Sequence, residues 1–323
     1  MSVSALALWH DSAVGSVLRR EVLPELQEGE LLLRTLFSLV SQGTERLVAC
    51  GAVPESLYTS MRVPYMGGDF SFPVKYGYAL VGEVLNEGHP WQGRAVFVMH
   101  PHQDYCVVAQ RDCFCLPANV SPRSAVLAAN VETAVTALWD ARPLLGERVL
   151  VVGFGLLGAL TALLLKEIPG VDLWISEPNS YRRDLAGKMG LRLWEGQYAG
   201  EFDLCVHSSA TEKGLQTALD ALGLEGRVLE LSWYGNKRSA LSLGGAFHHK
   251  RLRIISSQVS HLPSDMQARW GYARRKELVF DLLASDVFAS LPDGELAFWD
   301  LPAFFDELRG GSACDVLGLV VRY

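Results

Sequence analysis

Short runs of alternating apolar and polar residues dominate the first third of the chain. The clearest runs cover residues 30–36, 78–85, 94–99 and 105–108, with turn residues between them. Alternation with a period of two places one face of each strand against a core. We therefore expect residues 1–121 to form a β-rich domain.

From Pro122 onward, the spacing of apolar residues changes to one in which helices alternate with strands. Residues 124–140 have the spacing of an apolar helix. The predicted strands that follow are 148–153, 171–176, 203–208, 226–232 and 252–257. Such alternation is typical of a parallel sheet built from right-handed βαβ units. The pattern predicts a second, α/β domain over residues 122–262.

The last part of the chain, residues 263–323, contains further helices and one strand. Apolar spacing predicts helices over residues 278–283 and 301–308, and residues 316–322 have the apolar, valine-rich composition of a strand. We expect this strand to rejoin the first domain, so that one domain is inserted into the other.

A glycine-rich segment connects the first strand of the α/β domain to its helix. Gly153, Gly155 and Gly158 follow a β-branched run that ends at Val152, and Glu177 ends the next strand about twenty residues later. In a dinucleotide-binding turn the first glycine makes the turn, the second admits a pyrophosphate, and the third lets helix pack on strand. The helix N-terminus adds free N–H groups. The motif predicts a nicotinamide dinucleotide, and a purely structural turn is the alternative.

Composition and charge argue against several classes of protein. The chain has 323 residues, 49% hydrophobic and 20% charged, which fits two globular domains. A net charge of −7 without a basic arm argues against nucleic-acid binding. The nearest feature to a basic patch is the cluster Arg269, Arg274, Arg275 and Lys276, which we interpret as a solvated helix face.

The sequence also favours a soluble, cytoplasmic protein. No apolar run reaches the roughly eighteen residues of a membrane span, and the first residues lack the pattern of a secretory signal. The cysteines are scattered, as expected for free thiols in a reducing compartment. They are Cys50, Cys106, Cys113, Cys115, Cys205 and Cys314.

The order of the domains and several short strings resemble the medium-chain dehydrogenase/reductase superfamily. Gly43-Thr44-Glu45 resembles its G-T-D/E segment, and residues 75–82 resemble the strand that usually has the pattern G-H-E-x-x-G. Residues 226–231 resemble the fifth strand of its cofactor sheet. The resemblance implies a GroES-like β-rich catalytic domain and a Rossmann domain with a doubly wound parallel sheet. The chain also resembles, more loosely, the bacteriochlorophyllide hydroxyethyl dehydrogenase branch.

The chain departs from this family where a catalytic zinc would bind. The family's Cys, His and Glu positions correspond to Gln42, Tyr78 and Ala79, and residues 128–133 offer neither Cys nor His. An amide and a phenol are poor zinc ligands beside thiolate and imidazole. We therefore expect no zinc. The alternative is a metal cluster drawn from His100, His102, Cys106, Cys113 and Cys115.

Without a metal, charge that develops on a substrate oxygen needs hydrogen-bond or proton donors. The resemblance places Tyr78 in a vacated ligand position as a proton donor, Thr44 as a proton relay, and Gln42 against a substrate oxygen. A core role for Tyr78, surface positions for the loop histidines and a structural role for Glu45 are the alternatives. The candidate catalytic residues are Tyr78, Thr44, Gln42, His102, His100 and Glu45.

The resemblance also assigns residues to the cofactor. Glu177 is expected to accept the adenosine ribose hydroxyls and repel a 2′-phosphate, which favours NAD(H) over NADP(H). Arg182 and Arg183 lie close in sequence and could bind such a phosphate, so NADP(H) stays open. The candidate cofactor-binding residues are Gly153, Gly155, Leu156, Leu157, Gly158, Glu177, Arg182, Ser208, Ser209, Ser232, Trp233 and Ser257.

Together these features predict a zinc-independent, NAD(P)-dependent oxidoreductase. It would move hydride between nicotinamide and a carbonyl or secondary alcohol of a small to medium, partly apolar substrate. Enone or quinone reduction at a C=C bond is one alternative, and a catalytically inactive dinucleotide-binding sensor or scaffold is another. We expect a homodimer formed through the sixth strand of the cofactor sheet, and no nucleic-acid or membrane partner.

Overall fold

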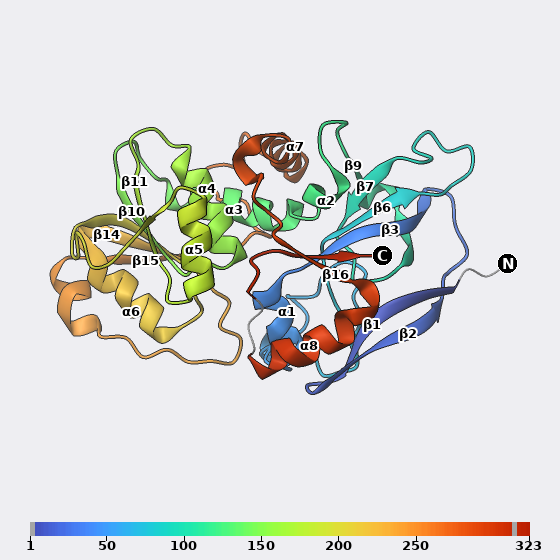
Figure 1. The fold of residues 1–323 in the computed structure, drawn as a ribbon, viewed down its shortest axis with the longest axis horizontal. Helices are drawn as coiled ribbons and strands as arrows, with labels where there is room; N and C mark the ends of the chain where they lie inside the picture. The colour runs from blue at the N-terminus through green and yellow to red at the C-terminus, as the bar shows by residue number, and fades with distance from the viewer. Residues whose placement is uncertain (1–3, 312–314) are drawn as a thin grey trace. The chain divides into compact units, whose positions relative to one another are not determined.

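The computed structural model describes residues 4–311 and 315–323, and the chain divides into two compact units (Figure 1). The first unit takes in the chain up to Ala129 and again from Leu291, and the second comprises Asn130–Ser290. These limits differ from the expected ones at both ends. Residues 122–129 belong to the first unit, and residues 263–290 belong to the second.

The first unit contains two sheets. The smaller has the order β2-β1-β5-β4, with β1 (Ser4–Ser12), β2 (Gly15–Val22), β4 (Gly67–Gly68) and β5 (Val74–Lys75). The larger has the order β16-β17-β3-β6-β7-β9, and β8 also pairs with β3. Its strands are β3 (Glu30–Val40), β6 (Leu80–Val84), β7 (Ala95–Val98), β8 (Tyr105–Ala109), β9 (Phe114–Cys115), β16 (Gly294–Ala297) and β17 (Leu319–Arg322).

The returning strand β17 completes the larger sheet, as the valine-rich C-terminus predicted. It runs antiparallel to β3, with Leu319 opposite Val40. Helix α8 (Leu301–Gly310) packs beside α1 (Gln42–Ala49) and the β1–β2 hairpin (Figure 1). Apolar side chains from these elements, Phe305 among them, form one buried cluster. The two ends of the first unit therefore share a core.

The second unit is built on one six-stranded parallel sheet with the order β12-β11-β10-β13-β14-β15. The strands are β10 (Arg148–Val152), β11 (Asp172–Ser176), β12 (Arg192–Leu193), β13 (Phe202–His207), β14 (Leu222–Glu230) and β15 (Arg253–Ser256). In chain order within the sheet this is 3-2-1-4-5-6, the doubly wound arrangement that binds dinucleotides at its switch point. That point lies between β10 and β13, at the carboxyl ends of the strands.

Helices and short helical turns lie between the strands of both units. The predicted helix over residues 124–140 is split into a short α2 (Pro122–Ala125) and α3 (Ala128–Ala141). The others are α4 (Leu156–Lys166), α5 (Ser180–Lys188), α6 (Glu212–Ala221) and α7 (Tyr272–Leu283). Short helical turns are η1 (Glu55–Leu57), η2 (Gln110–Asp112), η3 (Leu243–Phe247), η4 (Asp286–Phe288) and η5 (Phe298–Asp300). Eight of the eleven residues of α4, from Gly158 to Leu165, are buried.

The interpretation of the basic cluster as a solvated helix face is wrong for two of its four members. Arg269 and Arg274 are exposed, but Arg275 and Lys276 are only 3% and 4% exposed. Both point at Glu132 on α3, at 3.1 Å and 2.5 Å. A buried carboxylate satisfies the two cations, which the linear sequence could not show. This contact also ties α7 to the second unit.

Two further expectations concern thiols and membranes. Five of the cysteines are free thiols in the structure, while Cys314 lies outside the described residues. Within the described part of the chain, no helix combines the length and the apolar character that crossing a membrane requires.

Candidate dinucleotide and proton-donor sites

The glycine-rich turn has the backbone geometry that its sequence predicts. Gly153 adopts φ +98°, and a Cβ built there would lie 2.8 Å from the Ser209 backbone nitrogen. A Cβ on Gly158 would lie 2.1 Å from the Gly153 carbonyl oxygen, so helix and turn touch directly. Gly155 differs, because its ideal Cβ meets only one guanidinium nitrogen of Arg182, at 3.8 Å. The space beside Gly155 is therefore largely open.

Gly155 is the N-cap of α4, and the first helical residues, Leu156 and Leu157, follow it. Their backbone N–H groups belong to the first turn, where no carbonyl of the same helix can accept from them. Together with the helix dipole, such groups attract a phosphate. The turn and the helix end therefore place free N–H groups together, as the sequence motif predicts.

Glu177 follows the next strand, β11, and its carboxylate is hydrogen bonded to the glycine-rich turn. It is 7% exposed. It accepts hydrogen bonds from the Phe154 N–H at 2.7 Å and from the Asn179 N–H at 2.8 Å. Each oxygen keeps a second acceptor position, because an ionised carboxylate has about four lone-pair sites. Glu177 therefore has the position and the acceptor capacity that its expected ribose contact needs.

The two arginines after Glu177 have different surroundings. Arg183 donates to the Glu177 carbonyl oxygen at 3.3 Å and forms an ion pair with Glu195. Arg182 lies in the first turn of α5, where the Asn179 side chain caps its N–H at 3.0 Å, and its guanidinium is the group nearest the ideal Cβ of Gly155. Of the two, only Arg182 has its guanidinium beside the glycine-rich turn.

The serines expected near the cofactor divide into two sets. The Ser208 hydroxyl donates to the Gly153 carbonyl at 2.9 Å, and the Ser232 hydroxyl accepts from the Ala210 N–H at 3.0 Å. With Ser209, these residues border the glycine turn. Ser257 is instead engaged with Asp140 on α3, at 2.5 Å. Trp233, next to Ser232, is half-buried.

The first unit contains a buried polar network around Glu45. Its carboxylate accepts the Ser41 N–H at 2.7 Å and contacts His102 Nε2 at 2.9 Å. The other ring nitrogen of His102, Nδ1, lies 2.7 Å from the Ser38 hydroxyl, which also contacts the Tyr323 hydroxyl at 2.9 Å. Glu45 and His102 are each 1% exposed. The alternative of a surface position for His102 is therefore wrong.

Tyr78 lies beside this network. Its phenol is hydrogen bonded to the side chains of Ser41 and Thr44. Burial and the nearby Glu45 raise the pKa of Tyr78 to about 12, and the two hydroxyl contacts oppose that rise. The adjacent Gly77 has φ +135°, and its ideal Cβ would lie 3.2 Å from the His102 backbone nitrogen. Close approach of the two segments brings Tyr78, Thr44, Glu45 and His102 together.

Two candidate residues have other partners. The Gln42 amide donates to the Val316 carbonyl at 3.4 Å. His100 is 4% exposed, contrary to the surface alternative, and donates from Nδ1 to the Pro101 carbonyl at 2.9 Å. Burial lowers the pKa of His100 to about 3, so its ring is neutral at ordinary pH. A neutral ring is a poor general acid.

The side chains present do not fit a zinc ion. Gln42 and Tyr78 are an amide and a phenol already engaged with protein groups. Among residues 4–311 and 315–323, no group of three or more His, Cys, Asp or Glu side chains could hold a metal. The alternative cluster of loop histidines and cysteines therefore does not assemble.

Sequence reasoning missed a second histidine–carboxylate pair, in which the histidine is fully buried and the carboxylate half-buried. His207 ends β13 and Glu230 ends β14, and the two residues are opposite each other in the parallel register. Their side chains meet at 2.7 Å. The signal was present, because each of these predicted strands carries an ionisable residue near its carboxyl end. Only the strand order makes them neighbours.

Comparison with known proteins supports the resemblance on which these assignments rest. No family model matches the chain. It is 30% identical over 172 residues to L-threonine 3-dehydrogenase of Pyrococcus furiosus, covering 49% of each chain. It is 23% identical over 183 residues to D-guloside 3-dehydrogenase of Escherichia coli K12, covering 52% of each. The chain therefore spans about half the length of the curated relatives it matches.

Solved structures match over almost the whole chain. Acetophenone reductase of Geotrichum candidum, in complex with NAD, has a TM-score of 0.77 at 18% identity, over 99% of this chain and 97% of that one. A Sinorhizobium meliloti dehydrogenase bound to NADP has a TM-score of 0.76 at 15% identity, over 99% and 100%. L-idonate 5-dehydrogenase of Escherichia coli has 0.77 at 14%, over 100% and 99%. The chain therefore has the fold of the medium-chain dehydrogenases/reductases, in which a GroES-like β-rich unit accompanies a Rossmann unit.

Proposed function

We propose that this chain is an NAD(P)-dependent oxidoreductase of the alcohol dehydrogenase type. One observation carries the proposal. A three-glycine turn, with open space at its second glycine, begins a helix at the switch point of a 3-2-1-4-5-6 parallel sheet. Relatives and structural neighbours that are named dehydrogenases support the same class.

In this proposal the second unit holds the dinucleotide. The N–H groups of Leu156 and Leu157 bind the pyrophosphate, and Glu177 accepts the adenosine ribose hydroxyls. A carboxylate at that position disfavours a 2′-phosphate, so we propose NAD(H) as the preferred cofactor. Arg182 is the residue that would lessen this preference. The bound nicotinamide supplies or takes up the hydride.

The first unit supplies the proton donor. Reduction of a carbonyl adds hydride to carbon and a proton to oxygen, and Tyr78 holds that proton. Because the pKa of Tyr78 is about 12, the phenol stays protonated until negative charge develops on the substrate oxygen. An alkoxide is more basic than a phenolate, so transfer is then favourable. The Ser41 and Thr44 side chains stabilise the resulting phenolate, and the reverse steps oxidise a secondary alcohol.

We further propose that the reaction needs no zinc. This proposal rests on the side chains at the positions where the family's zinc ligands stand, which are Gln42, Tyr78 and Ala79. The looser resemblance to the bacteriochlorophyllide hydroxyethyl dehydrogenase branch supports a secondary alcohol of a partly apolar molecule as the substrate. Metal analysis of the purified protein and assays with a chelator test this point. One stoichiometric zinc, with activity lost on its removal, would contradict it.

The decisive experiment titrates the whole chain with NADH and with NADPH, using calorimetry. We expect binding of both, with NADH tighter. Gly155→Ala places a methyl group in the open space and should weaken binding at least tenfold without unfolding the protein. Gly187→Ala, on α5 with no atom within 4 Å of its ideal Cβ, is the matched control and should bind normally.

A substrate panel separates the remaining alternatives. Oxidation of NADH with ketones supports the proposal, whereas turnover of enones or quinones alone would assign C=C reduction. Tight cofactor binding with no turnover of any class would assign a sensor or scaffold.

We also propose that the protein is a homodimer joined through β15. This strand is one of the two edge strands of the parallel sheet, and Ile254 on it is 40% exposed. Edge strands with unpaired backbone groups are suited to pairing across a two-fold axis. Light scattering at a monomer mass across the micromolar range would contradict the dimer.

A further inference from the structure

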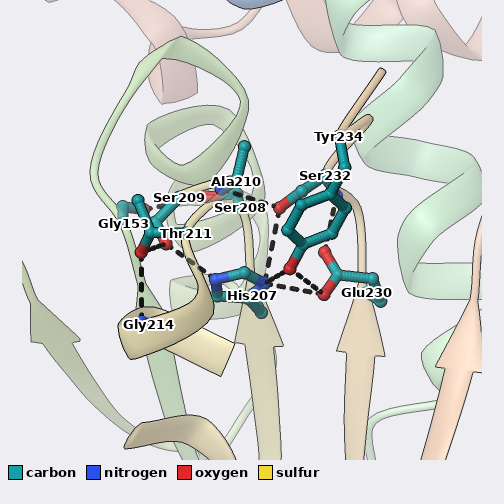
Figure 2. A network of polar contacts seen from close by, with 10 residues as sticks. All are labelled: Gly153, His207, Ser208, Ser209, Ala210, Thr211, Gly214, Glu230, Ser232 and Tyr234. Atoms are coloured by element: carbon teal, nitrogen blue, oxygen red, sulfur yellow. Dashed lines mark hydrogen bonds and ion pairs between the residues drawn. The ribbon is translucent and has the colours of Figure 1, made fainter. Parts of the chain in front are cut away.

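His207 lies at the centre of a polar network at the carboxyl end of the Rossmann sheet (Figure 2). Its side chain is fully buried. Nδ1 lies 2.7 Å from a Glu230 carboxylate oxygen, and Nε2 lies 2.7 Å from the Ser209 hydroxyl. The imidazole thus joins a carboxylate on one strand to a hydroxyl in the loop that follows the other.

The Glu230 carboxylate fixes the proton on Nδ1. It also accepts the Ser232 N–H at 2.7 Å and the Tyr234 hydroxyl at 3.1 Å. Burial opposes its ionisation, but the hydrogen bonds from His207 and Ser232 outweigh burial and lower the pKa of Glu230. An ionised carboxylate can only accept hydrogen bonds. The proton between Glu230 and His207 therefore belongs to Nδ1.

The other side of the ring is a chain of hydroxyls. The Thr211 hydroxyl accepts the Gly214 N–H at 3.0 Å, capping α6, and lies 2.9 Å from the Ser209 hydroxyl. The Thr211 hydroxyl can donate a hydrogen bond to the Ser209 oxygen, and the Ser209 hydroxyl can donate one to Nε2 of His207. Every hydroxyl in this arrangement has both a donor and an acceptor.

The first turn of α6 closes over these atoms. An ideal Cβ on Gly214 would lie 2.2 Å from the Ser209 hydroxyl oxygen and 2.8 Å from His207 Nε2. Only glycine leaves room for the contact between them. Gly214 is therefore part of the same polar network.

The network adjoins the glycine-rich turn. An ideal Cβ on Gly153 would lie 2.9 Å from the Ser209 Cβ. Ala210, the next residue, has φ +51°, a conformation costly for a residue with a side chain. Its N–H is held by Ser232. The loop after β13 is thus fixed against both neighbouring segments, at the place where the dinucleotide is proposed to lie.

We propose that His207 is a positioning residue for the dinucleotide, acting through Ser209. Because Nε2 accepts the hydrogen bond from the Ser209 hydroxyl, the Ser209 oxygen keeps an acceptor position for a ribose hydroxyl of the cofactor. Glu230 keeps the ring in the Nδ1–H tautomer that makes this possible. The inference rests on the proposed function, since it needs a dinucleotide at the glycine turn.

The test measures the NADH dissociation constant and the tautomer separately. Ser209→Ala should raise the dissociation constant about tenfold. Ser242→Ala, an exposed serine, is the matched control and should leave it unchanged. Glu230→Gln keeps an oxygen that accepts from Nδ1, so its affinity should stay within about threefold of the native protein, whereas Glu230→Leu should lose about tenfold.

Two-bond ¹H–¹⁵N spectra of protein labelled at histidine report the tautomer directly. His207, assigned through His207→Gln, should show a protonated Nδ1 and an unprotonated Nε2, and Glu230→Leu should shift it toward Nε2–H. Native protein that binds neither NADH nor NADPH would overturn the proposed function and this inference together. Native binding with an Nε2–H tautomer, or with equal affinity in Ser209→Ala, would overturn the inference alone. A fall in melting temperature in Glu230→Leu at unchanged affinity would also overturn it, because it would assign a merely structural role.

Discussion

The Nε2 atom of His102 lies 2.9 Å from the Glu45 carboxylate, and neither side chain is more than 1% exposed. Glu45 lies on α1, the helix that follows β3, and His102 lies in the loop before β8. A carboxylate at this depth is tolerated because His102 and the Ser41 N–H satisfy both of its oxygens. The pair therefore joins two segments of the chain in the β-rich unit.

Replacing Glu45 should weaken this connection. Glu45→Gln keeps the shape but loses the charge-assisted acceptor, so we expect a loss of about 1–3 kcal/mol in the free energy of unfolding, measured in urea. Glu87→Gln, at an exposed position, is the control and should unfold like the native protein. Equal stability of all three proteins would contradict a structural role for the pair.

Removing the Tyr78 hydroxyl tests the proton donor. Tyr78→Phe should lower kcat for ketone reduction by about a hundredfold, with the dissociation constant for NADH unchanged. Tyr76→Phe, a buried neighbour whose ring lies 6.0 Å away, is the matched control. With a pKa of about 12, Tyr78 should add no step to the pH profile of kcat between about pH 6 and 10. Normal turnover by Tyr78→Phe would end its proposed role.

Acid should destabilise the first unit through two buried imidazoles. Burial lowers the pKa of His10 and of His100 from 6.5 to about 3. Below pH 6.5 these histidines are protonated in the unfolded chain but stay neutral in the folded chain. The free energy of unfolding therefore decreases as the pH falls from 6.5 toward 3. Each group contributes roughly 1 kcal/mol per pH unit to that slope.

Urea unfolding at pH 7, 6 and 5 measures this effect. His100→Gln should make the dependence on pH shallower, because one of the two responsible groups is gone. His249→Gln, at an exposed position, should leave the slope as it is. A slope that is the same in both variants would show that His100 is not responsible.

The buried ion cluster of the second unit should be intolerant of losing its carboxylate. Glu132→Gln removes the buried carboxylate that both Arg275 and Lys276 contact, which should cost about 3–5 kcal/mol in the free energy of unfolding. Replacing all three side chains with Leu or Met should recover much of this loss. Asp11→Asn, in the more exposed pair with Arg19, should cost less than about 1 kcal/mol. A loss below about 1 kcal/mol in Glu132→Gln would contradict the cluster's importance.

The sequence was most informative where the chemistry is local. The strand that ends at Val152, the spacing of Gly153, Gly155 and Gly158, and the acid at Glu177 are all close in sequence. Because each step of that turn depends on neighbouring backbone atoms, residue order alone was enough to predict it. The valine-rich C-terminus likewise predicted the strand that joins β3.

The tertiary structure decided which distant polar groups meet. The partners Glu45 and His102 are separated by 57 residues, and Glu132 and Arg275 by 143. In the Rossmann sheet, the register of two strands sets Glu230 against His207. A single sequence carries the identity of each such residue, but a buried charge is made tolerable only by its partner, and chain topology chooses that partner.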